Sequence, residues 1–436
     1  MSQDPSFRPT AGDRARAERA VLVTGIGAVS GFGWGVAVLR AGLRAGESAV
    51  RPPRRLAVHG HRTALAAEVP EGGPPGLDAA GRGLSRADRF ALAAAREAVD
   101  QAGVEPLLRA RPERVGVFFG GSTAGMAEAE GYLARVLGTS PGRPRLHDLV
   151  GQQLDAPGNS VARVYGVEGP VETVSSACAS GGLAVLAALD AIRRGEIDRA
   201  LAGGADSLCQ LTYAGFNALR AVDPAPCRPF RADRAGLSLG EGAGVLVLES
   251  AASARERGAR ALARIAGAGA SCDAHHMTAP HPEGEGAAAA IRVALEEGGR
   301  VALVHAHGTG TPLNDASEAQ ALRRALLAGE GSGELPPTTS VKGAIGHLLG
   351  SAGAIEAVAT VLALLDGELQ PTAGGGAADP GLGVDLVLGA PRAVGSGEAR
   401  GLSTSFAFGG ANVALVIATP EPTGEPTRDP VAEGGR

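Results

Sequence analysis

The sequence is poor in cysteine, in aromatic residues and in long apolar runs, and these shortages exclude several classes of protein. The four cysteines, Cys178, Cys209, Cys227 and Cys272, lack paired spacing, which argues against both a disulfide scaffold and a metal site. No stretch approaches twenty apolar residues, so no membrane span is expected. A net charge of −5 makes nucleic acid an improbable partner. Residues 1–18 lack the pattern of a secretory signal, and we expect a cytoplasmic protein.

Lysine is the scarcest charged residue, because 40 of the 41 basic residues are arginine and only Lys342 is lysine. Arginine therefore occupies every position at which any cation would serve. A position that keeps lysine indicates a need for a compact ammonium, which a forked guanidinium cannot replace. Lys342 also lies five residues before His347, in a Gly-rich segment. This setting favours a functional role for Lys342 over compositional drift.

At 436 residues the chain is long enough for two domains or one duplicated unit. Strand-like segments that run into Gly- or Thr-rich loops recur in the same order in its two parts. The matched pairs are 20–29 with 261–270, 114–123 with 300–309, 173–178 with 338–342, 200–206 with 401–406, and 242–249 with 410–417. Alternating strands and helices predict two α/β halves packed as an α/β/α/β/α five-layer sandwich. We expect disordered tails at 1–18 and 419–436 around halves at 19–255 and 256–418.

Cys178 is the best candidate nucleophile, because it follows a strand-like run and precedes a small-residue helix. A helix N-terminus lowers the pKa of a thiol, and the thiolate is the reactive form. His307 ends a strand, and His347 lies in a Gly-His turn before a helix, so both side chains can project into a cleft. His305 is expected to play a supporting part at most. The remaining histidines and cysteines are interpreted as structural.

The glycine-rich segment 405–412, Ser-Phe-Ala-Phe-Gly-Gly-Ala-Asn, lacks the Lys-Ser/Thr of a phosphate loop. Its glycines allow close approach of the backbone to a substrate. We therefore expect the N–H groups around Gly409 and Gly410 to face a developing oxyanion.

At these residues the chain resembles the β-ketoacyl-acyl-carrier-protein synthases of the thiolase superfamily, specifically the elongating Cys-His-His kind. The resemblance covers about residues 19–418. It rests on four signatures, namely the segment around Cys178, His307-Gly-Thr-Gly-Thr-Pro-Leu-Asn-Asp315, Lys342 with Gly346-His347, and Phe406-Ala-Phe-Gly-Gly410. It implies a thiolase-like fold, and a cofactor-free condensation of a Cys178-bound acyl group with malonyl-acyl carrier protein. It also implies a homodimer, or a heterodimer with a related subunit.

The resemblance assigns further roles. Thr309 and Thr311 correspond to residues that bind phosphopantetheine, and Phe408 to an aromatic gate whose N–H, with that of Cys178, holds the oxyanion. Asp315 is expected to support the catalytic residues, and Glu318 corresponds to the carboxylate paired with Lys342. A basic segment with Arg82, Arg86 and Arg89 is expected to receive the acidic carrier protein, although a solvated helix face is equally compatible with it.

Three alternatives remain to be compared. A degradative thiolase needs a second cysteine near the C-terminus, whereas the last cysteine here is Cys272. A non-catalytic subunit that sets chain length would lack the nucleophile. An initiating synthase would have asparagine in the place of the second histidine. Departures from the family pattern at Gly343, Ala407 and Ala411 favour a specialised polyketide or polyene pathway over primary fatty-acid synthesis.

Overall fold

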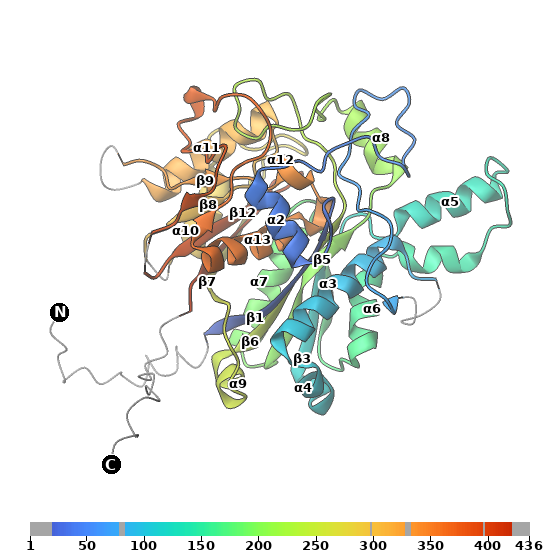
Figure 1. The fold of residues 1–436 in the computed structure, drawn as a ribbon, viewed down its shortest axis with the longest axis horizontal. Helices are drawn as coiled ribbons and strands as arrows, with labels where there is room; N and C mark the ends of the chain where they lie inside the picture. The colour runs from blue at the N-terminus through green and yellow to red at the C-terminus, as the bar shows by residue number, and fades with distance from the viewer. Residues whose placement is uncertain (1–19, 78–82, 297–298, 328–332, 396, 421–436) are drawn as a thin grey trace, which may run out of the picture.

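The computed structural model describes residues 20–77, 83–296, 299–327, 333–395 and 397–420. Two five-stranded sets, joined edge to edge, form its main sheet (Figure 1). The first set runs β4 (Val171–Val174), β3 (Val115–Gly120), β5 (Arg199–Asp206), β6 (Gly242–Ser250) and β1 (Val21–Ser30). The second runs β9 (Thr338–Thr339), β8 (Leu303–His305), β12 (Arg400–Phe406), β13 (Ala411–Ala418) and β7 (Ala263–Cys272).

The two sets have the same pattern of strand directions, which confirms the duplication predicted from the sequence. In the first, β3 is parallel to β4 and β5, while β6 is antiparallel to β5 and β1. In the second, β8 is parallel to β9 and β12, while β13 is antiparallel to β12 and β7. The sets meet where Val21–Val23 of β1 pairs with Ala263–Ile265 of β7.

Helices fill the layer between the two sets and cover their outer faces (Figure 1). The middle layer consists of α7 (Ser180–Arg193) and α13 (Ala352–Asp366), whose apolar side chains share one core with both sets of strands. Outside the first set lie α3 (Arg86–Ala102) and α6 (Ala156–Tyr165), and outside the second lie α10 (Glu285–Ala294) and α11 (Pro312–Leu326). This is the predicted five-layer α/β/α/β/α sandwich.

Equivalent glycines explain the close approach of helix to strand in each half. A Cβ on Gly27 of β1 would lie 1.9 Å from the carbonyl oxygen of Ala94 in α3. A Cβ on Gly269 of β7 would lie 2.2 Å from the carbonyl oxygen of Ala290 in α10. Any other residue would push the helix away from the sheet. The glycine-ended strand segments that predicted the duplication therefore have a packing role.

The smaller elements connect these layers. The remaining helices are α2 (Val36–Ala45), α4 (Glu105–Ala110), α5 (Met126–Val136), α8 (Gln210–Ala218), α9 (Ala251–Glu256) and α12 (Lys342–Ile345). Short strands are β2 (Gly33–Trp34), β10 (Glu368–Leu369) and β11 (Arg392–Ala393), and 3-10 turns lie at Pro112–Arg114, Leu146–Gln152, Leu349–Ser351 and Pro380–Leu382.

One described segment, Leu349–Asp366, is long and apolar enough to cross a membrane, but it is the buried core helix α13 with the turn before it. The expected bounds of the two halves remain predictions. The expected tails at 1–18 and 419–436 lie outside the described residues, apart from Thr419 and Pro420.

Candidate active site

Cys178 lies in the turn between β4 and α7, where Ala177 has a φ of +44° and the thiol is 8% exposed. Burial raises the pKa of this thiol to about 11, although Lys342 and backbone N–H groups oppose the shift. The expectation of a lowered pKa is therefore wrong, because desolvation of the thiolate outweighs the helix N-terminus. Cys178 rests as a thiol and must lose its proton as it attacks a substrate.

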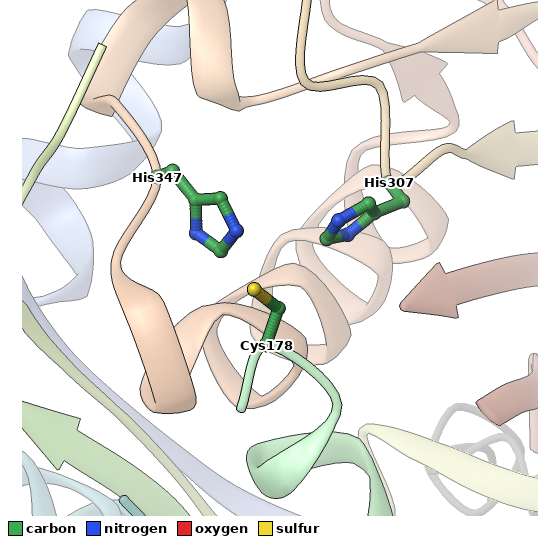
Figure 2. A group of neighbouring side chains, drawn as sticks. All are labelled: Cys178, His307 and His347. Carbon is green, nitrogen blue, oxygen red and sulfur yellow. The ribbon is translucent and has the colours of Figure 1, made fainter. Parts of the chain in front are cut away.

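The structure brings Cys178 of the first half together with His307 and His347 of the second. His307 follows β8, and His347 follows α12. The sulfur and the nearest nitrogens of the two histidines all lie within 4.8 Å of one another. Figure 2 shows the sulfur pointing into the space between the two imidazole rings. The ring centroids are 5.4 Å apart, and the rings are nearly perpendicular.

Hydrogen bonds fix the tautomer of both histidines. His347 Nδ1 accepts the backbone N–H of Leu349 at 3.0 Å, and His307 Nδ1 lies 3.1 Å from Lys342 Nζ, which can only donate. The proton of each neutral ring is therefore on Nε2. The His347 Nε2 atom is buried, and none of the described residues forms a hydrogen bond with it. Both rings can thus donate a hydrogen bond to an oxygen atom placed beside the sulfur.

The electrostatics of the site keep these rings neutral. Burial lowers the pKa of His307 and of His347 well below the ordinary value, and the positive charge of Lys342 lowers both further. Neutral imidazoles are poor at holding an extra proton but remain hydrogen-bond donors. The pair is therefore suited to stabilise a developing negative charge rather than to act as a general acid at rest.

Lys342 is 1% exposed, and its ammonium group is surrounded by acceptors. Its Nζ donates to the carbonyl oxygen of His307 at 2.6 Å and forms an ion pair with Glu356 of α13. The expected pairing of Lys342 with Glu318 is therefore wrong. Sequence reasoning missed Glu356, although it is the one charged residue in the apolar run 348–365.

Glu318 and Asp315 instead hold the loop that follows His307. Glu318 accepts the N–H groups of His307 at 2.8 Å and Gly308 at 2.7 Å, and Asp315 accepts that of Gly310 at 3.2 Å. Burial raises the pKa of Glu318 to about 7 and that of Asp315 to about 6. Both carboxylates therefore support the backbone of the site without touching the sulfur.

The segment 405–412 supplies one backbone N–H to the site. The N–H of Phe408, with that of Cys178, lies close enough to the thiol to lower its pKa. The N–H of Gly409 donates to Met277 O at 2.8 Å, and that of Gly410 to Ala407 O at 3.0 Å. The expected oxyanion role of the Gly409 N–H is therefore wrong, because that donor is already engaged.

A cavity of about 300 Å³ leads from solvent to the sulfur. Its lining includes Cys178, Phe216, Thr309, Thr311 and Phe408. The hydroxyl oxygens of Thr309 and Thr311 lie 2.9 Å apart. Phe408 is 38% exposed, and its ring stacks on that of Phe216 at 5.8 Å. The threonines thus offer polar groups along the cavity, and Phe408 lies where an aromatic gate is expected.

The basic segment at the start of α3 differs from the expectation. Arg86 has a side chain that is 10% exposed, and it donates to Glu241 at 2.6 Å and 2.9 Å. Its expected role in docking is therefore wrong, because a buried ion pair engages the guanidinium. Arg89 is exposed, and Arg82 lies outside the described residues. Ser85 is the N-cap of α3 and accepts the N–H of Asp88 at 3.1 Å.

The thiol and the two imidazoles also form a possible set of metal ligands. Zinc binds thiolate and neutral imidazole. Here the raised pKa of Cys178 and the ammonium of Lys342 beside His307 both oppose a bound cation. The expectation that the site has no metal remains a prediction.

A duplicated five-layer fold with cysteine and two histidines at its junction defines a condensing acyltransferase. The chain matches the β-ketoacyl synthase N-terminal domain over 18–254 and the C-terminal domain over 262–375. It belongs to the β-ketoacyl synthase family.

Related proteins span nearly the whole chain. A putative polyketide β-ketoacyl synthase 1 of Streptomyces halstedii is 38% identical, and nodulation protein E of Rhizobium sp. (strain N33) is 36% identical. Each match covers 92% of this chain and 99% of the relative. Among solved structures, the ishigamide ketosynthase/chain length factor is 36% identical with a TM-score of 0.83, covering 92% of this chain and 100% of that chain.

Proposed function

We propose that this protein is a 3-oxoacyl-[acyl-carrier-protein] synthase that extends acyl chains by decarboxylative condensation. The observation that carries the proposal is the arrangement of two neutral Nε2–H donors beside one buried thiol. In the first stage, the Cys178 sulfur attacks the acyl thioester of a carrier protein. The carrier's pantetheine thiol leaves with the proton, and the acyl group becomes bonded to Cys178.

In the second stage, malonyl-carrier protein loses CO₂, and the electron pair of the broken C–C bond moves into an enolate. Its oxygen accepts hydrogen bonds from Nε2 of His307 and of His347, which offsets the new charge in a water-poor site. The enolate carbon then attacks the carbonyl of the acyl-Cys178. The resulting oxyanion faces the N–H groups of Cys178 and Phe408. Its collapse releases the Cys178 sulfur, which takes up a proton from solvent to become a thiol again, and leaves the 3-oxoacyl chain on the carrier protein.

The proposal includes the partners and setting of the enzyme. Phosphopantetheine enters along Thr309 and Thr311, and no cofactor takes part, since both stages use only side chains and backbone N–H groups. One solved relative, 29% identical with a TM-score of 0.82, is described as a type II polyketide ketosynthase with its acyl-carrier protein. We assign an acyl-carrier protein and a second synthase-like subunit, in the cytoplasm, as partners of this chain. The two stages have different requirements for Cys178, which makes the proposal testable.

Cys178→Ala should abolish acyl loading and condensation while the protein stays folded, because alanine suits the start of α7. Intact mass after incubation with acyl-carrier protein measures the loading. Cys178→Gln should retain or raise CO₂ release from malonyl-carrier protein, because the amide mimics the acylated cysteine. Condensation by Cys178→Ala would contradict the proposal. Absence of both loading and CO₂ release in the unmodified chain would instead favour a non-catalytic subunit.

A further inference from the structure

A buried carboxylate outside the Cys-His-His group joins three separate segments of the chain. Asp206, at the end of β5, is 0% exposed. Its Oδ1 accepts the backbone N–H groups of Thr123 and Ala124, each at 2.8 Å. Its Oδ2 accepts the N–H of Gly350 at 2.7 Å, and both oxygens lie 3.0 Å from the N–H of Ser122. Four backbone donors therefore converge on one side chain.

One of these segments is connected to the nucleophile. The hydroxyl of Ser122 donates to the carbonyl oxygen of Ala177 at 3.2 Å. Ala177 directly precedes Cys178, and its φ of +44° is uncommon for a residue other than glycine. A non-glycine residue persists in this region only where its surroundings hold it. Asp206 thus reaches the nucleophile turn through Ser122.

The other segment is connected to a histidine. Gly350 follows Leu349, which has a φ of +54° and whose N–H donates to His347 Nδ1 at 3.0 Å. A Cβ on Gly350 would lie 2.7 Å from the backbone nitrogen of Ser122, so the two segments are in direct contact. The carboxylate of Asp206 binds both segments where they meet. It therefore links a turn of the first half to a turn of the second.

We propose that Asp206 is a positioning residue, which sets the distance between the Cys178 sulfur and His347 Nε2 by holding both turns. The inference rests on the proposed function, because the distance matters only if both groups act on one substrate. A carboxylate is required, since both oxygens accept backbone N–H groups. In Asp206→Asn, an amide NH₂ would face donors at one of the two positions and push that segment away.

The first test is Asp206→Asn in the full chain, with Glu97→Gln as the matched control. Glu97 is also a carboxylate that accepts two backbone N–H groups, those of Ala28 at 3.0 Å and Val36 at 2.7 Å, but it lies in α3 away from the sulfur. Misplacing reacting groups by about 1 Å can lower a rate roughly 100-fold. We expect Asp206→Asn to lower kcat at least tenfold, with KM for malonyl-carrier protein within about twofold, and Glu97→Gln to leave both unchanged.

Ser122→Ala tests the two turns separately, because the hydroxyl of Ser122 donates its hydrogen bond to Ala177 on the nucleophile side. It should slow acyl loading of Cys178, yet leave CO₂ release unchanged when combined with Cys178→Gln. Asp206→Asn should lower both. Folded Asp206→Asn protein with normal kcat would overturn the proposal. So would rate losses in Asp206→Asn and Glu97→Gln that follow their thermal stability alone.

A substrate-free measurement keeps this test independent of the proposed function. The alkylation rate of Cys178 by iodoacetamide reports on the nucleophile turn. We expect Asp206→Asn to change it at least threefold, and Glu97→Gln to leave it unchanged. If the unmodified chain neither loads an acyl group nor releases CO₂, the proposed function fails, while this alkylation result still decides whether Asp206 positions Cys178. An alkylation rate unaffected in folded Asp206→Asn would count against the positioning role.

Discussion

Replacing Lys342 by arginine should impair the enzyme although the charge is kept, and the geometry of the ammonium explains why. Three acceptors surround Nζ, namely His307 Nδ1, the carbonyl oxygen of His307 and the carboxylate of Glu356. An ammonium has three N–H donors directed apart, which matches these three acceptors. A planar guanidinium on a longer side chain cannot meet them in the same buried space. The one lysine of the chain is thus used at a position for which its shape is suited.

The size of the effect follows from the hydrogen bond to His307. Losing a hydrogen bond that involves a charged group costs roughly 1.5–3 kcal/mol in a buried site. If the cost falls on the transition state, it corresponds to a loss of roughly 10- to 150-fold in rate. CO₂ release from malonyl-carrier protein, measured in Cys178→Gln protein, isolates this step from acyl loading. Adding Lys342→Arg to Cys178→Gln should therefore lower the rate of CO₂ release at least tenfold.

A pH series distinguishes this reasoning from simple misfolding. Lys342→Met removes the positive charge that lowers the pKa of His307, so His307 should become protonated at a higher pH than in the unmodified chain. Loss of the ammonium also removes the donor that kept the proton of the neutral His307 ring on Nε2, and protonation of the ring restores an N–H there. The deficit of Lys342→Met should consequently shrink as the pH is lowered. A rate for Lys342→Arg within twofold of normal, or a deficit of Lys342→Met that is constant with pH, would refute the reasoning.

Three further predictions concern other parts of the chain. Burial lowers the pKa of His305 to about 3. Below the unfolded-state pKa of His305, near 6.5, the unfolded chain therefore binds more protons than the folded chain. His305 should lower the free energy of unfolding by about 2 kcal/mol between pH 7 and pH 5. Denaturant melts should show a smaller loss of stability over this range in His305→Asn. Arg86→Ala should destabilise the fold by about 3–5 kcal/mol, because it leaves Glu241 buried and unpaired. It should lower the activity toward carrier-bound substrates and toward small pantetheine thioesters by the same factor. Thr309→Ala should raise KM for both substrates with a smaller change in kcat, and an unchanged KM would contradict its place on the pantetheine path.

Much of the fold could be predicted because the two halves repeat the same local patterns. The Gly-ended strands at 20–29 and 261–270 became β1 and β7, whose glycines contact α3 and α10. Boundaries were harder to predict. The apolar run 348–365 becomes the helix α13 only from Ala352, because Leu349–Ser351 forms a 3-10 turn. Apolar periodicity does not distinguish these two kinds of turn.

In the candidate site, residue types in local motifs were easier to predict than their distant partners. Cys178, His307 and His347 each lie beside small residues in turns, which marked them in the sequence. Glu356 lies in the middle of a buried helix, and only the fold brings it to Lys342. The direction of the Gly409 N–H depends on where Met277 lies, which no local pattern encodes. The pKa of Cys178 depends on its burial, which the helix-start pattern alone does not give.

The resting charges of the site explain why a raised thiol pKa is compatible with catalysis. Cys178 is a thiol, both histidines are neutral, and the positive charge of Lys342 is paired with Glu356, so the resting site carries little net charge. A buried site without unpaired charge avoids a large desolvation cost. Negative charge then arises only during reaction, on the enolate and on the oxyanion, where N–H donors are already in place. The same burial that makes the free thiolate unfavourable therefore strengthens the interactions that stabilise the transition states.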